Sequence, residues 1–208
     1  MRSPRVQKRP LVIRLTHWLN AFAIVCMTMS GWAIYNASPL FAFRFPVWAT
    51  LGGWLGGSVA WHFATMWLLV SNAIVYVGYA LWSGHFRRNL LPLRPADILR
   101  EANLALRLRL PHQAGRYNAV QRLAYVVVLL LGMIAVASGL ALWKPVQMST
   151  LAMALGGYEA ARRIHFVAMA GIVTFTVIHL VMVMLIPRTL IGMITGRGGV
   201  DTAREGAI

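Results

Sequence analysis

Four long apolar stretches, separated by polar and charged segments, dominate the pattern of the chain. They cover about residues 11–35, 58–82, 119–143 and 163–187. Each stretch is long enough to cross the hydrocarbon core of a bilayer, about 30 Å, as a helix. Because the stretches take up about half of the chain, little remains for a soluble domain. The pattern predicts an all-α membrane protein, a four-transmembrane-helix bundle that forms a single domain over residues 1–208.

The charged residues give this bundle an orientation. The 208 residues include 20 Lys and Arg against 5 Asp and Glu, a net charge of +15. Sixteen of the basic residues lie near both termini or around the segment 84–118, and four lie on the other side: Arg44, Lys144, Arg162 and Arg163. The positive-inside rule places both termini and this central segment in the cytoplasm, N-in and C-in. Because the positive charge forms no contiguous patch, nucleic-acid binding is not expected.

The first apolar stretch differs from a cleaved secretory signal, although basic residues precede it. It is too long, and it carries Arg14, His17 and Asn20 within its first half, which the apolar core of a signal peptide would tolerate poorly. We expect it to be a retained first helix.

Four histidines, His17, His62, His165 and His179, lie within the apolar stretches. Ionisable side chains in a membrane are costly and usually have a function. His165 and His179 are 14 residues apart, which brings them within roughly 40° on one helix face and separates them by about 21 Å along the axis. Since successive helices alternate in direction, His17 and His179 fall near the cytoplasmic side, and His62 and His165 near the outer side. Topology alone therefore predicts two pairs, one at each depth.

Two facing imidazoles inside a helix bundle predict a haem with both axial positions filled, a site for electron transfer rather than for oxygen binding. The chain has no C-x-x-C-H motif, and its single cysteine, Cys26, lies in the first stretch, so two non-covalent haems b are expected. Structural zinc would need four ligands at one point. Proton relays normally include carboxylates, and the four stretches contain none. For any one histidine alone, a hydrogen bond to a neighbouring helix is the simpler explanation.

Small and basic residues near these depths are candidates for contact with the haems. Gly31, fourteen residues after His17, and Gly132 and Gly139 in the third stretch could admit a bulky macrocycle, although ordinary helix packing explains each equally well. Arginine is a natural partner for haem propionates. The candidates are Arg162 and Arg163 for the outer haem and Arg14 and Arg122 for the inner haem, and topology signalling is an equal explanation for all of them.

Two segments outside the stretches carry further predictions. The cytoplasmic segment 84–118 contains PADILREANLALRLRL, in which apolar residues recur at helical spacing among arginines. This indicates an amphipathic helix on the inner leaflet, and the nearby His85 and His112 are expected to be solvated or interfacial. The outer segment FAFRFPVWATLGGWLGG could contact a second subunit or lie on the membrane surface.

Several segments resemble the prokaryotic cytochrome b561 family, which includes the membrane cytochrome b subunits of nickel-iron hydrogenases and formate dehydrogenases. The resemblance is carried by RLTHWLN, WHFATMWLLV, YNAVQRLAYVVVLLLGMIAVASGLALWKPVQ and RRIHFVAMAGIVTFTVIHLVMVMLIPRTL, and it covers about residues 10–197. It implies a four-helix bundle with two haems b that exchanges electrons with a quinone near the inner haem. By matching positions, His17 and His179 would hold the inner haem, and His62 and His165 the outer one. The KPVQ and YNAVQR segments are most similar to subunits that accompany sulfite-oxidase-like molybdopterin oxidoreductases.

The outer segments are short and contain no catalytic constellation, so we expect the chain to be an electron-transfer subunit rather than a complete enzyme. It would move electrons between a periplasmic oxidoreductase, possibly molybdopterin-dependent, and the membrane quinone pool. One alternative is a stand-alone superoxide:quinone oxidoreductase of the same fold, which a basic outer surface around Lys144, Arg162 and Arg163 would favour. Another is a membrane anchor without redox activity. The sequence does not give the direction of electron flow.

Overall fold

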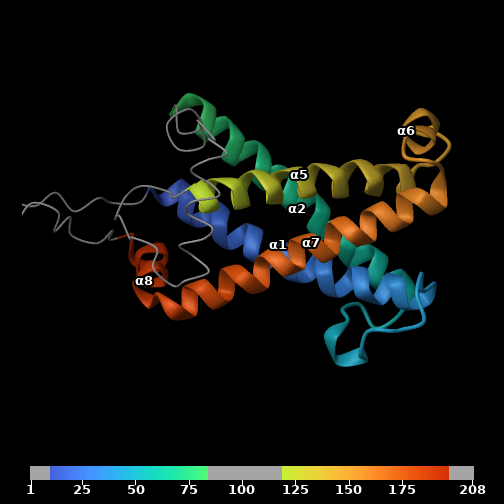
Figure 1. Ribbon diagram of the computed structural model, residues 1–208, viewed down its shortest axis with the longest axis horizontal. Helices are drawn as coiled ribbons and strands as arrows, with labels where there is room; N and C mark the ends of the chain where they lie inside the picture. The colour runs from blue at the N-terminus through green and yellow to red at the C-terminus, as the bar shows by residue number, and fades with distance from the viewer. Residues whose placement is uncertain (1–9, 84–118, 197–208) are drawn as a thin grey trace, which may run out of the picture. The chain divides into compact units, whose positions relative to one another are not determined.

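The computed structural model describes residues 10–83 and 119–196, and these residues are helical and contain no strand (Figure 1). The elements in chain order are α1 (Leu11–Ala37), the 3₁₀ helix η1 (Val47–Ala49), α2 (Leu55–Trp82), α5 (Ala119–Trp143), α6 (Ser149–Ala154), α7 (Tyr158–Leu185) and α8 (Pro187–Thr195). They form two compact units. The first contains α1, η1, α2 and α8, and the second contains α5, α6 and α7.

The prediction of four long apolar helices is confirmed. Among the described residues, α1, α2, α5 and α7 are the helices long and apolar enough to cross a membrane. Their bounds differ from the predicted ones mainly at α7, which begins at Tyr158 and ends at Leu185. A new helix starts at Pro187 after a break at Ile186, whose φ is −130°, because proline has no N–H with which to continue α7. The predicted amphipathic helix, His85 and His112 lie outside the described residues.

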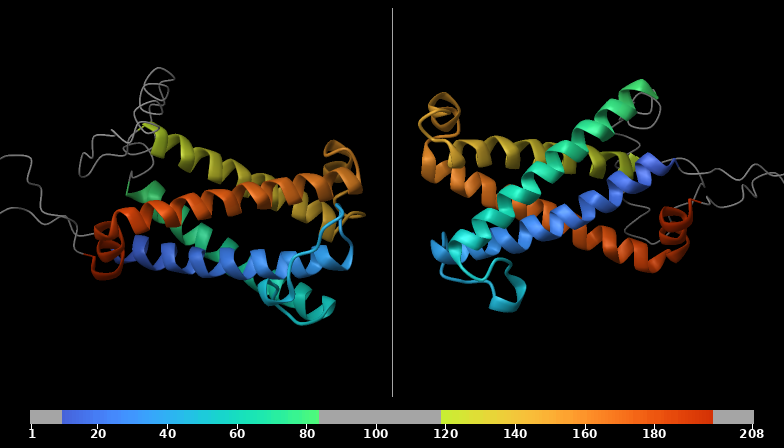
Figure 2. Two further views of the ribbon diagram at one scale, coloured as in Figure 1. Left: turned by 60° about the horizontal axis from the view of Figure 1, so that its bottom comes forward. Right: turned by 180° about the vertical axis from the view of Figure 1, so that it is seen from behind.

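In the first unit, α1 and α2 form an antiparallel hairpin, seen from two further sides in Figure 2. The connecting segment is fixed to α1 by the Leu51 N–H, which donates to the Met29 carbonyl over 3.1 Å. Gly52 has a φ of +113°, and a Cβ there would lie 2.4 Å from the Ser58 backbone nitrogen. Only glycine is therefore compatible with this tight approach to the first turns of α2.

Buried polar residues join the two helices of this hairpin near the start of α1. The Asn72 amide donates to the Thr16 carbonyl over 2.8 Å and to Asn20 Oδ1 over 2.6 Å. Thr16 and Asn72 are both buried. Because neither water nor lipid satisfies such groups at this depth, the interhelical hydrogen bonds fix the register of α1 on α2.

In the second unit, α5 and α7 form a hairpin whose connection includes α6 (Figure 1). Three buried alanines, Ala141, Ala152 and Ala161, bring the end of α5, α6 and the start of α7 together. Gly156 and Gly157 have φ values of +87° and +90°, left-handed conformations that allow the chain to turn from α6 into α7. The sequence pattern did not predict α6, because six residues are too few to show a period.

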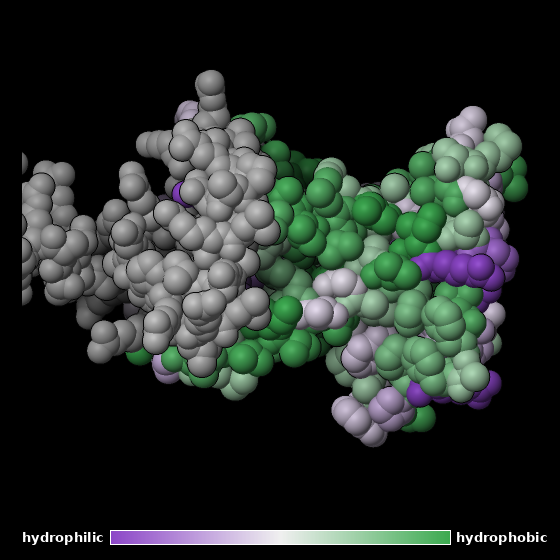
Figure 3. All heavy atoms as spheres, in the orientation of Figure 1, coloured by the Kyte–Doolittle hydropathy of each residue, from purple (hydrophilic) through white to green (hydrophobic). Residues whose placement is uncertain are grey.

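The surface of the helices is apolar. Met133, Val167 and Met184 are exposed by 60, 63 and 70%. On the face seen in Figure 3, hydrophobic side chains cover most of the described surface of the long helices. A contiguous apolar surface of this kind is what contact with lipid requires.

Candidate functional site

His62 is held against α1 within the first unit. It is the eighth residue of α2, and its Nδ1 lies 3.1 Å from the hydroxyl of Ser30. Ser30 is fully buried, and its Oγ lies 2.6 Å from the Cys26 carbonyl of the preceding turn. Gly31 adjoins the same ring, because a Cβ built there would lie 3.5 Å from His62 Cε1.

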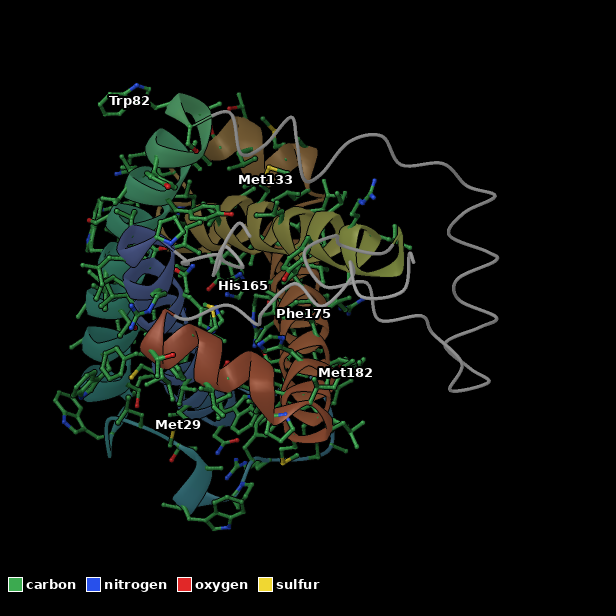
Figure 4. The ribbon with its side chains drawn as sticks, turned by 90° about the vertical axis from the view of Figure 1, so that its left-hand side faces the viewer. Met29, Trp82, Met133, His165, Phe175 and Met182 are labelled. Carbon is green, nitrogen blue, oxygen red and sulfur yellow. The ribbon has the colours of Figure 1, made fainter. Side chains whose placement is uncertain are left out.

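His165 has the same surroundings within the second unit. It is the eighth residue of α7 and lies on the side of that helix that faces α5 (Figure 4). Its Nδ1 lies 3.1 Å from the Ser138 hydroxyl and 2.9 Å from the Ala135 carbonyl. Ser138 is fully buried and bonds to the Ile134 carbonyl over 2.6 Å. A Cβ on Gly139 would lie 3.2 Å from His165 Cε1.

The two hairpins therefore repeat one local motif. Each places a Ser-Gly pair near the end of its first helix against a histidine in the third turn of its second long helix. The sequence repeats as well, since SGWA at 30–33 matches SGLA at 138–141, and HFATM at 62–66 matches HFVAM at 165–169. The sequence interpretation found both histidines and both glycines but missed the serines, and this repeat was the signal that could have revealed them.

His17 lies near the start of α1, and His179 lies near the end of α7. His17 is the seventh residue of α1, and His179 is the seventh from the end of α7. The His17 ring meets Trp18 edge-on at 5.5 Å, and the His179 ring is parallel to Phe175, one turn earlier, at 6.1 Å. Each imidazole thus has an aromatic neighbour on its own helix.

Each predicted pair takes one histidine from each unit: His17 and His62 belong to the first, and His165 and His179 to the second. Among the described residues, no group of three or more His, Cys, Asp or Glu side chains could hold a metal ion. The pairings themselves stay predictions.

The candidate arginines have different surroundings. Arg14 donates from Nε to the Met193 carbonyl over 3.0 Å and from Nη2 to the Ile194 carbonyl, so its guanidinium group caps the end of α8 in the first unit. Arg162 pairs with Glu159, one turn earlier, at 3.1 Å, whereas Arg163 is exposed and Arg122 is half-buried. Their predicted contacts with propionates stay predictions.

Two further residues of the long helices are notable: Gly132 has open space beside it, and Trp32 has a buried donor without a partner among the described residues. A Cβ on Gly132 would have nothing within 4 Å, so this face of α5 is open within the described residues. The indole N–H of Trp32 is buried and has no hydrogen-bond partner among the described residues. Trp32 directly follows Gly31 and stacks on Phe45 with ring centroids 4.5 Å apart. Its unpaired donor lies next to the Ser-Gly pair of the first hairpin.

Comparison with known proteins shows a matching family and a similar relative. The model of the family described as prokaryotic cytochrome b561 matches residues 8–196. A relative from Azospira oryzae is 48% identical over 188 residues, which cover 90% of this chain and 95% of the relative. The name of that relative assigns it, provisionally, as subunit YedZ1 of a protein-methionine-sulfoxide reductase. No solved structure matches the chain.

Proposed function

Because the chain belongs to the prokaryotic cytochrome b561 family, we propose that it is the haem b electron-transfer subunit of an oxidoreductase in a bacterial inner membrane. His17 and His179 would hold one haem near the cytoplasmic side, and His62 and His165 a second haem near the outer side. Haem b, when bound, would carry one electron at a time by alternating between ferrous and ferric iron.

The positions of the histidines along their helices support this pairing. His62 and His165 are each the eighth residue of a helix that follows an outer segment, and His17 and His179 each lie seven residues from the other end of α1 and α7. If successive spans alternate in direction, equal distances from the helix ends correspond to equal depths, at 1.5 Å per residue.

The chemistry of the outer histidines fits an iron ligand. In both rings Nδ1 is within hydrogen-bond distance of a neighbouring helix, which leaves Nε2 as the nitrogen that could coordinate iron. Histidine ligands usually donate the other ring N–H to an oxygen in this way. The two glycines beside the rings let the imidazoles approach the neighbouring helix, because a Cβ there would lie 3.5 Å and 3.2 Å from the Cε1 atoms. This shared geometry is the observation that carries the proposal.

The partner is proposed from the relative. Since the Azospira protein is named as a subunit of a protein-methionine-sulfoxide reductase, the partner of this chain would be a periplasmic oxidoreductase that reduces methionine sulfoxide in proteins. Electrons would then flow outward, from the membrane quinone pool to the partner. Reduction of the sulfoxide to the thioether consumes two electrons and two protons and releases water, so the subunit would turn over twice for each sulfoxide.

The outer surfaces favour a docked protein over a small anionic donor. Of the three cations that the superoxide alternative needs, Arg162 is paired with Glu159 and Lys144 lies over the Trp143 ring at 5.2 Å, whereas Arg163 is exposed. Large apolar side chains are instead exposed around the outer segments: Phe41, Phe43, Val47, Trp48, Trp54 and Val146. The superoxide alternative is therefore the weaker of the two.

Haem content tests the first part of the proposal. Detergent-purified protein should give about two haems b per chain in a pyridine haemochrome assay, and His62→Ala or His179→Ala should each lower the value to about one. A folded preparation without haem would contradict the redox function and leave the anchor without redox activity.

The direction of flow needs a second experiment. The subunit, purified together with its partner, is reduced with a quinol analogue, and the haem spectrum is followed after addition of methionine sulfoxide. Reoxidation only when the partner is present would support the proposal. Rapid reduction of the isolated subunit by superoxide, with transfer to quinone, would support the alternative.

A further inference from the structure

The repeated Ser-Gly motif assigns a role to two serines. We propose that Ser30 and Ser138 are positioning residues for the outer haem. The Ser30 hydroxyl fixes the tautomer and the orientation of His62, and the Ser138 hydroxyl helps to orient His165. The inference rests on the proposed function. It goes beyond that function because it names two residues that would act through the histidines, without contacting the iron or a substrate.

The hydrogen bonds of Ser30 determine which nitrogen of His62 carries the proton. A serine hydroxyl has one proton and two lone pairs. The Cys26 carbonyl, 2.6 Å from Ser30 Oγ, can only accept, so it takes the hydroxyl proton. Towards His62 Nδ1, 3.1 Å away, the same oxygen can then only accept. His62 is therefore the Nδ1–H tautomer, with its lone pair on Nε2.

His165 is also the Nδ1–H tautomer, but here a backbone carbonyl determines it. The Ala135 carbonyl lies 2.9 Å from His165 Nδ1, and a carbonyl cannot donate, so Nδ1 carries the proton. Ser138 Oγ, at 3.1 Å from the same nitrogen, gives its own proton to the Ile134 carbonyl over 2.6 Å and shares the Nδ1–H. In both histidines Nε2 would therefore be the nitrogen that binds the haem iron.

The neighbouring glycines make the contact of these serines with the rings possible. Gly31 and Gly139 each follow the serine directly, and a Cβ at these positions would lie 3.5 Å and 3.2 Å from the Cε1 atoms of the rings. The serine thus holds the Nδ1 edge of the ring, and the glycine lets the Cε1 edge approach the helix. The same arrangement is built independently in two hairpins.

Helix geometry alone does not account for the contact. A hydroxyl bonded to the carbonyl four residues earlier is common in helices, and Ser58 has such a bond to the Trp54 carbonyl at 2.9 Å. Ser58 is also buried, at 1% exposure. Its hydroxyl, however, has no hydrogen bond to a histidine among the described residues. Ser58 therefore serves as a matched control.

The expected effect follows from ligand basicity. A hydrogen bond from Nδ1–H to an oxygen makes the imidazole a stronger donor to the metal, which favours ferric over ferrous iron. Removing the serine hydroxyl should raise the midpoint potential of the outer haem and leave that of the inner haem in place. Loss of a hydrogen bond around a metal site of this kind typically weakens metal affinity about 10-fold or more.

The test uses the full chain in detergent, with Ser30→Ala, Ser138→Ala, Ser30→Thr, Ser138→Thr and the control Ser58→Ala. Midpoint potentials are titrated by absorbance, the low-spin ferric signals are recorded by EPR, and haem loss to apomyoglobin is timed. We expect Ser30→Ala to raise the potential of the outer haem, shift its EPR signal and speed its loss about 10-fold. Ser138→Ala should change the same quantities in the same direction but less, because His165 keeps its hydrogen bond to the Ala135 carbonyl. The Thr variants, which keep a hydroxyl, should stay close to the unsubstituted protein.

The outcomes separate this inference from the proposed function. If the unsubstituted protein holds two haems and both Ser→Ala variants match Ser58→Ala in potential, EPR signal and haem retention, the positioning role is wrong and the electron-transfer function stands. Thr variants that shift as far as the Ala variants would also overturn a role for the hydroxyl. If one Ala variant fails to accumulate, the other hairpin carries the test, because each serine belongs to a separate unit. Unsubstituted protein without haem overturns both proposals.

Discussion

At the scale of single residues, the polar side chains within the apolar helices are the main evidence for function. The histidines were identifiable from the sequence because an ionisable residue in a membrane span requires an explanation. The serines are harder to identify, because a hydroxyl in a helix can bond to its own backbone, and only the repeated Ser-Gly pair points to them in the sequence. Their role becomes visible in the structure, where Ser30, unlike Ser58, contacts a histidine 32 positions away.

Gly31 and Gly139 are expected to differ in how well they tolerate substitution by alanine. A Cβ on Gly139 would lie 3.2 Å from His165, whereas one on Gly31 would lie 3.5 Å from His62, an ordinary van der Waals distance. Gly139→Ala should therefore displace its histidine and shift the outer-haem EPR signal more than Gly31→Ala does. Gly132→Ala is the control for a general effect on α5, because a Cβ at this position would have nothing within 4 Å. A larger shift in Gly31→Ala than in Gly139→Ala would contradict this ranking.

Asn72 is expected to stabilise the first hairpin. Asn72→Leu keeps the side-chain volume but removes the hydrogen bonds to the Thr16 carbonyl and to Asn20. Interhelical hydrogen bonds in membranes contribute roughly 0.6 to 1.7 kcal/mol each, so the thermal midpoint of the protein should fall. Thermal unfolding in detergent, followed by circular dichroism, measures this, with the exposed Ser71→Ala as the control. An unchanged midpoint would show that the buried amide contributes no net stability.

At the scale of elements, hydropathy identified the spans, but contacts set the ends of the helices. The apolar pattern predicts a fourth stretch that starts at about residue 163. The helix begins at Tyr158 instead, since Gly156 and Gly157 provide the turn. The helices α6 and α8 were missed because both are short, and α8 depends on Arg14, which is 179 residues away from Met193.

Arg14 should hold the C-terminal turn of α8. Its guanidinium group reaches the Met193 and Ile194 carbonyls, and a cation at a helix C-terminus stabilises it by up to about 1 kcal/mol. In Arg14→Ala, hydrogen exchange of the α8 amides should therefore rise about fivefold, as measured by mass spectrometry, and exchange in α7 should not change. Arg163→Ala, which removes an exposed arginine, is the matched control. Equal exchange in the two variants would rule out the capping role.

At the scale of the whole molecule, the proposed function needs two predicted pairs of histidines, each with one member from each unit. His17→Ala, His179→Ala and the double variant should all lose the same haem and keep the other, because one ligand cannot hold an iron that needs two. The haem spectra at low temperature, with the potential of the remaining haem, identify which one is lost. A double variant that loses both haems, or single variants that lose different haems, would break the predicted pairing.

The segment after α1, which is predicted to lie on the outer side, is held in place by its own contacts. Asn36 exchanges two hydrogen bonds with Phe45, from Nδ2 to the carbonyl over 2.8 Å and from the Phe45 N–H to Oδ1 over 2.9 Å. The Phe45 ring stacks on Trp32. A protein that docks here would meet a surface already in its bound shape, so association would lose little conformational entropy. More of the interaction free energy would then remain as affinity for the partner, because less of it would be lost in ordering the segment.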